Sequence, residues 1–193
     1  MASDASGLHA GLDARGFAVW RGAFDGGACD AMARQAAGQA MPAVLPPAWR
    51  ARFDGVRDTL AALAARWRGA QADPGLALDA WVRAVDAEQD APLVTSGDAD
   101  AGFGLLLVVL LNRPGVDFDG GELVLAEQRP RMQTRPHVVP LRQGDLAVIA
   151  AAGRPVQGAR GPYRVTARHG VARVRGGTRI ALMAGWPLAR VHV

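Results

Sequence analysis

The chain has 193 residues, 50% hydrophobic and 21% charged, which predicts a single globular domain and excludes a disordered chain. All 22 basic residues are arginine and the formal net charge is +4, but residues 1–128 hold 10 arginines and 17 acids, whereas residues 129–193 hold 12 arginines and one acid. The lone Cys29 excludes an internal disulfide, and the longest apolar run, Leu105 to Leu111, is too short to span a membrane.

The first residues of the chain have the periodicity of a helix followed by a strand. Leu8 and Leu12 lie one helical turn apart and predict a short helix that ends at Gly16. Phe17 and Val19 then alternate with small or polar neighbours, as in a half-buried strand.

Three further helices are predicted before Pro92. Asp25 is a suitable N-cap for a helix that runs to about Met41. Pro46-Pro47 opens a long helix that Gly69 ends, and one apolar stripe along it should pack into the core. The stripe is formed by Trp49, Phe53, Val56, Leu60, Leu63 and Trp67. The last predicted helix follows Pro74 and has an apolar face of Leu78, Trp81, Val82 and Val85.

From Pro92 the pattern changes to short β-rich runs separated by glycine, proline and aspartate turns. Leu105–Leu111 is apolar on both faces and predicts a central strand. Asp119-Gly120-Gly121 predicts a tight hairpin or a bulge. Further strands are predicted at Val138-Val139, Leu146–Ile149, Tyr163–Arg175 and Thr178–Trp186.

Helices first and antiparallel strands second predict an α+β fold. We expect a double-stranded β-helix, a relative of the jelly roll, backed by the N-terminal helices. The single domain would span residues 1–193, with residues 1–91 as mainly helical support and residues 92–187 as the β-helix core.

The run from Arg168 to Leu182 combines a candidate metal ligand with a candidate anion-binding residue. With a period of two, His169, Val171 and Arg173 share one face of a strand, Gly176-Gly177 supplies a turn, and Arg179 opens the returning strand. Imidazole is the commonest metal ligand, and a guanidinium group can bind a carboxylate through two parallel hydrogen bonds.

This run resembles the end of the Fe(II)/2-oxoglutarate-dependent dioxygenases, most closely bacterial members of the prolyl-hydroxylase type. The resemblance rests on His169, on Arg179 ten residues later, and on the strand-like runs Val116–Leu125 and Pro140–Ile149. It implies a β-helix core, and Fe(II) and 2-oxoglutarate as cofactors. It also implies that His169 is the last metal ligand and that Arg179 holds the distal carboxylate of 2-oxoglutarate.

The family's His-x-Asp motif on an early barrel strand is not intact in this sequence. No histidine lies between Leu93 and Leu107. The resemblance implies that Asp98 or Asp100 stands where the carboxylate ligand would be, with Asp98 or Ala99 near the histidine position. The run Gly97 to Asp100 is also typical of a solvated turn.

Two functions therefore remain open. The first is an Fe(II)/2-oxoglutarate-dependent dioxygenase that hydroxylates an unknown small molecule or peptide, with iron on His169 and on Asp98 or Asp100, and with Arg179 binding 2-oxoglutarate. The second is a degenerate, catalytically inactive member of the same fold that acts as a binding or scaffolding domain.

Partner and location are predicted more coarsely. The arginine-rich C-terminal third would attract an acidic cosubstrate, an acidic substrate or nucleic acid, but most of these arginines are expected at outward-facing, solvated strand positions. Tyr163 is the only aromatic residue between Phe118 and Trp186, which argues against a nucleic-acid platform. The N-terminus carries early acids, Asp4 and Asp13, in place of the basic start of a signal peptide. We expect a cytoplasmic bacterial protein that does not enter a membrane. The oligomeric state stays open.

Overall fold

A computed structural model describes residues 2–35, 41–69, 76–95, 103–129, 133–159 and 161–186. The helices are α1 (Ala2–Arg15), α2 (Gly26–Arg34) and α3 (Pro47–Arg68). The strands are β1 (Phe17–Trp20), β2 (Met41–Pro42), β3 (Asp79–Asp86), β4 (Ala91–Val94), β5 (Leu105–Leu110), β6 (Phe118–Gly120), β7 (Leu123–Gln128), β8 (Arg135–Val139), β9 (Leu146–Ala150), β10 (Gly153–Gly158), β11 (Gly161–Val171) and β12 (Val174–Gly185).

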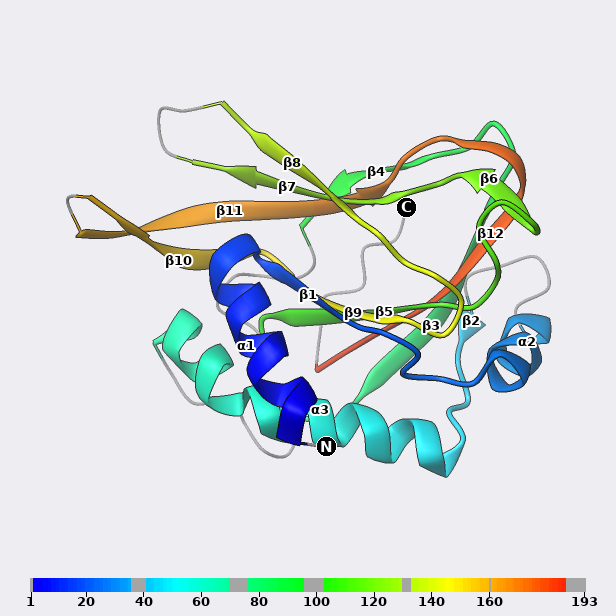
Figure 1. The fold of residues 1–193 in the computed structure, drawn as a ribbon, viewed down its shortest axis with the longest axis horizontal. Coiled ribbons are helices and arrows are strands. Elements are labelled where there is room, and N and C mark those ends of the chain that lie inside the picture. The colour runs from blue at the N-terminus through cyan, green and yellow to red at the C-terminus, as the bar shows by residue number, and fades with distance from the viewer. Residues whose placement is uncertain are drawn as a thin grey trace.

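The strands form two antiparallel sheets that face each other. The larger sheet has the order β1-β9-β5-β12-β3-β2, with β6 also paired to β12. The smaller sheet has the order β10-β11-β7-β8, with β4 paired to β11. In Figure 1, α3 lies along the side of the larger sheet that faces away from the smaller sheet, with α1 beside it. The predicted antiparallel strand-rich core is confirmed.

The first helix and strand and the long helix are confirmed close to their predicted bounds. Pro46 precedes α3 and Gly69 ends it in the left-handed conformation, with φ of 71°, which glycine adopts at low cost. Every side chain of the predicted stripe, from Trp49 to Trp67, is at most 5% exposed and belongs to the main core. In the described part of the chain, no helix is long and apolar enough to cross a membrane.

The predicted helix over Leu78–Val85 is wrong, because this segment forms strand β3. All eight residues of β3 pair with β12, from Asp79 opposite Gly185 to Asp86 opposite Thr178. Trp and Val favour extended backbone, and a continuous ladder of backbone hydrogen bonds outweighs a short helical spacing of apolar residues. The strand-rich part of the chain therefore begins before Pro92.

Two predicted boundaries also need correction. The second helix ends at Arg34 rather than near Met41, because Met41 belongs to β2 and pairs with Val82. Gly176-Gly177 is not a turn: both glycines lie inside β12, opposite Asp119 and Phe118 of β6. Gly177 has φ of 71°, and a Cβ atom there would lie 2.1 Å from the Asp117 carbonyl oxygen, so the close strand approach requires glycine.

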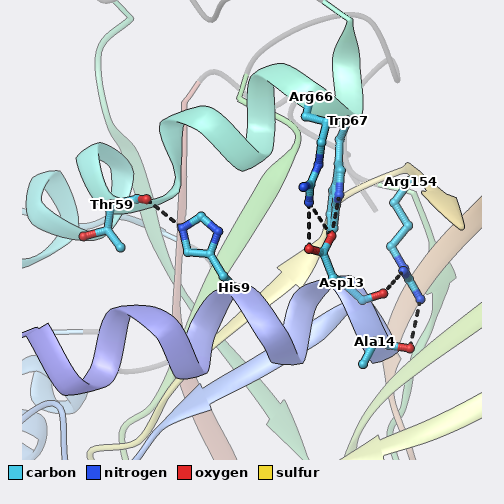
Figure 2. Close-up of polar contacts among 7 residues, drawn as sticks. All are labelled: His9, Asp13, Ala14, Thr59, Arg66, Trp67 and Arg154. Carbon is cyan, nitrogen blue, oxygen red and sulfur yellow. Dashed lines mark hydrogen bonds and ion pairs between the residues drawn. The ribbon is translucent and has the colours of Figure 1, made fainter. Parts of the chain in front are cut away.

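Polar contacts tie α1 to α3 and to strand β10 (Figure 2). The His9 ring lies within hydrogen-bond distance of the Thr59 carbonyl oxygen, and Asp13 pairs with Arg66 and accepts a hydrogen bond from the Trp67 indole. Arg154 of β10 donates to the carbonyl oxygens of Asp13 and Ala14, at the last turn of α1. These contacts fix the helices against one end of the β core.

Arg154 also forms a buried ion pair with Glu127 of β7. The Arg154 Nε atom lies 2.6 Å from the Glu127 carboxylate, and the two side chains are 1% and 2% exposed. A buried charge is costly unless a partner and additional hydrogen bonds compensate for its lost hydration. Arg154 meets this requirement with one carboxylate and the carbonyl groups of α1.

Glu127→Ala should destabilise the fold strongly, because it leaves the Arg154 guanidinium buried without its carboxylate. We expect a loss of about 3–5 kcal/mol in the free energy of unfolding, measured by urea denaturation. The double variant Glu127→Leu/Arg154→Met should lose less, because it removes both charges together. Asp119→Ala, which breaks an exposed ion pair with Arg175, is the control. A loss no greater than that of the control would contradict the prediction.

Candidate functional site

Arg179 is a buried cation on the central strand of the larger sheet. It lies on β12 opposite Val85 of β3, and its side chain is 3% exposed. A Cβ atom on Gly121 would lie 3.0 Å from the Arg179 Cδ atom, so glycine at position 121 leaves the space that this side chain occupies. Among the described residues, no carboxylate forms an ion pair with Arg179.

His169 approaches the same region from the smaller sheet. It lies on β11 between Val94 of β4 and Leu125 of β7, and it is 4% exposed. Directly paired residues of antiparallel strands present their side chains on the same face. The position on β4 that faces His169 is therefore held by an aliphatic side chain, Val94.

His169 and Arg179, which the sequence predicted to lie close together, line one cavity between the two sheets. The cavity has a volume of about 30 Å³, close to the space of one liquid water molecule. Among the described residues, the charged and titratable side chains that line it are Arg83, His169 and Arg179. The remaining lining is Ala91, Pro92, Val94, Val108, Leu123, Gly170, Val171, Ala181 and Met183. Within the described lining, the two arginines give the cavity a positive charge that favours an anion.

Arg83 is a site residue that the sequence reasoning missed. It is half-buried on β3, where the pattern from Leu78 to Val85 predicted a helix. In a strand, Arg83 shares a face with Trp81 and Val85, and a charge between two large apolar residues on one strand face is the signal that would have marked it.

Burial lowers the pKa of both His169 and Arg179. Burial, with a smaller contribution from the charge of Arg83, lowers the pKa of His169 from 6.5 to about 4. The same two causes, in the same order, lower the pKa of Arg179 from its ordinary value to about 10. At neutral pH the imidazole is therefore neutral and the guanidinium is charged, so the cavity presents two arginine cations beside a neutral ring.

Among the remaining candidates, Arg173 does not line the cavity. Asp98 and Asp100 lie outside the described residues. Arg173, predicted to share a strand face with His169, follows the end of β11, is exposed and forms an ion pair with Glu88.

Fe(II) does not fit the donor set that the described residues supply. Non-haem iron of this class is held by two histidines and one carboxylate on one face. The described ranges contain no group of three His, Cys, Asp or Glu side chains positioned to hold a metal ion. His169 is one suitable donor, but it faces Val94 and lies near Arg83, whose positive charge opposes a divalent cation.

The buried imidazole should make stability depend on pH. A folded-state pKa of about 4, below the ordinary 6.5, means that the unfolded chain binds more protons between these pH values. The stabilisation is complete above pH 6.5 and is lost as the pH falls to 4. We expect His169→Gln to remove a pH-dependent loss of about 3 kcal/mol, measured as urea unfolding free energies at pH 7 and pH 4.5. His137→Gln is the control. Equal losses in wild type and His169→Gln would refute the assignment.

Comparison with known proteins places the chain in a family. The sequence pattern of an oxygenase family, described as catalysing oxidative methylation of damaged DNA, matches residues 85–185. The uncharacterised protein Rv2227 of Mycobacterium tuberculosis is 41% identical over 80 residues, which cover 42% of this chain and 34% of that protein. The chain thus spans about a third of the length of the curated relatives it matches.

Solved structures share the fold. A prolyl 4-hydroxylase from Pseudomonas putida has a TM-score of 0.63 at 17% identity, over 94% of this chain and 93% of that chain. An oxidoreductase of the 2OG-Fe(II) oxygenase family from Burkholderia pseudomallei has a TM-score of 0.57 at 19% identity, over 94% and 89% of the two chains. The predicted resemblance to the Fe(II)/2-oxoglutarate-dependent dioxygenases is confirmed at the level of fold and superfamily. Because the family pattern covers more than half of its length, the chain belongs to this oxygenase family.

Proposed function

We propose that this chain binds one carboxylate of 2-oxoglutarate, or of a small dicarboxylate of the same class, on Arg179 at the cavity between its sheets, and that it acts as a binding domain rather than as an iron oxygenase. The observation that carries the proposal is Arg179, a buried cation that lines the cavity and has no ion-pair partner in the described ranges. An uncompensated buried charge costs several kcal/mol, which a bound carboxylate would offset.

The described side chains that line the cavity support binding of a carboxylate over binding of Fe(II) for oxygen chemistry. In the strand ladder His169 lies opposite Val94, and among the described residues the two charged side chains that line this cavity with it are both arginines. Guanidinium groups match carboxylates in geometry and charge, whereas they repel a metal dication. The cavity chemistry therefore favours an organic anion.

An active dioxygenase is the second candidate. It is favoured by Asp98 and Asp100, which follow β4 in the sequence and supply two carboxylates within six residues of Val94. The family description names damaged DNA, and the 12 arginines of residues 129–193 would attract such a substrate. This candidate requires iron on His169 and on one of the two aspartates.

Arg179→Met should abolish most of the affinity for 2-oxoglutarate. Loss of a charged, two-point contact in a largely dry cavity should weaken binding by about 2–5 kcal/mol, measured by calorimetry in the presence of a chelator. Arg175→Met is a matched control, because Arg175 is an exposed arginine of the same strand and pairs with Asp119. The same affinity in wild type and Arg179→Met would remove Arg179 from the binding site.

Iron separates the two candidates. Under anaerobic conditions, a binding domain should take up 2-oxoglutarate without the visible charge-transfer band that Fe(II) and 2-oxoglutarate form together in this enzyme class, and should release no succinate when oxygen is admitted. Stoichiometric iron with succinate release, lost in His169→Ala and in either Asp98→Ala or Asp100→Ala, would instead establish the active dioxygenase.

A further inference from the structure

The turn between β6 and β7 lies against the side chain of Arg179. Two residues of this turn, Gly120 and Gly121, have positive φ, at 73° and 64°. A Cβ atom on Gly120 would lie 2.5 Å from the Arg173 carbonyl oxygen, so the backbone approach alone requires glycine there. A Cβ atom on Gly121 would instead meet two side chains, because Arg179 Cδ and Val174 Cγ2 would both lie 3.0 Å from it. Gly121 is therefore in a position to control where the Arg179 side chain lies.

The backbone of this turn is held by the connection between β11 and β12. The Gly121 amide donates a hydrogen bond to the Arg173 carbonyl oxygen, at 3.1 Å, and the Ala172 amide donates to the Glu122 carbonyl oxygen, at 2.9 Å. Moving the turn away from Arg179 would break or lengthen both hydrogen bonds, which is unfavourable. A side chain at position 121 would therefore be accommodated by movement of its neighbours rather than of the turn.

Among those neighbours, Arg179 is the one with freedom to move. Val174 and Phe118, the other two side chains nearest this point, are 0% and 4% exposed and belong to one buried apolar cluster. Close-packed apolar side chains resist displacement, whereas an arginine stem has several rotatable bonds, and Arg179 borders the cavity. Carbon atoms in contact are ordinarily about 3.5–4.0 Å apart, so an added methyl group would displace the Arg179 stem by roughly 0.5 Å or more.

We propose that Gly121 is the positioning residue for Arg179. Because position 121 has no side chain, the Arg179 stem packs against the turn, and this contact holds the guanidinium group where it receives a carboxylate. A guanidinium that is fixed before binding loses less conformational freedom when the carboxylate arrives, which increases the affinity. This inference rests on the proposed function, since it assigns the element that orients the same binding residue.

Calorimetry with 2-oxoglutarate tests the role of Gly121 in binding. The whole chain is titrated in excess chelator as wild type, Gly121→Ala and Gly115→Ala. Gly115 is the matched control: its φ is 75°, and within the described part of the chain a Cβ atom there would have no neighbour within 4 Å. We expect Gly121→Ala to weaken binding about tenfold or more, because binding sites tolerate displacements of only about 0.5 Å. Gly115→Ala should stay within about twofold of wild type.

A double-mutant cycle separates the positioning of Arg179 from general strain. Urea midpoints are measured for Gly121→Ala in wild type and in the Arg179→Ala background. The shortened side chain has no Cδ atom, so Gly121→Ala should lower the midpoint less in that background. Backbone strain at position 121 and the contact with Val174 are present in both backgrounds and do not produce this difference. If Gly121→Ala alone does not fold, Gly121→Ala/Arg179→Ala should still fold, for the same reason.

The outcomes distinguish this inference from the proposed function. If wild type does not bind 2-oxoglutarate, or binds it equally in Arg179→Met, the proposed function fails and this inference with it. If binding depends on Arg179 but Gly121→Ala binds as tightly as wild type, only the role of Gly121 is overturned. The same conclusion follows if Gly115→Ala weakens binding as much as Gly121→Ala does, or if Gly121→Ala lowers the urea midpoint equally in both backgrounds.

Discussion

The backbone ladder of β12 is the constraint on which the rest of the structure depends. This strand pairs with β3 from Thr178 to Gly185 on one side and with β5 on the other, while its first residues pair with β6. Because side chains alternate along a strand, these registers determine that Arg179, Ala181 and Met183 face the smaller sheet. A shift of one residue would turn Arg179 toward the helices and bring apolar residues into the cavity.

The local patterns of the sequence predicted the parts of the fold that are decided by short-range chemistry. The proline pair and Gly69 mark the ends of α3, and the apolar run from Leu105 marks a buried central strand, because such signals act within a few residues. The segment around Trp81 was predicted wrongly, because its partner strand lies about 100 residues later in the sequence. Pairing over that separation has no local signature.

The same distinction applies to the site. His169 and Arg179 were predicted to lie close together, and the motif that unites them is contained within the last quarter of the chain. Arg83 escaped prediction because its segment was interpreted as a helix, and its position opposite Ala181 follows from the β3–β12 register. The apolar partner of His169 was hidden for the same reason, since Val94 is placed opposite it only by the pairing of β4 with β11.

The contacts of Arg154 make helix α1 a structural part of the β core rather than a removable cover. Its last-turn carbonyl groups accept hydrogen bonds from the guanidinium of Arg154, a buried residue of β10 whose other partner is Glu127 of β7. Fraying of α1 would strip a buried cation of part of its solvation, so the helix, the β10–β11 hairpin and β7 should open as one cooperative unit. In a hydrogen-exchange experiment, the backbone amides of α1 would then be protected to a degree similar to those of the central strands. Segments near a chain terminus ordinarily exchange early.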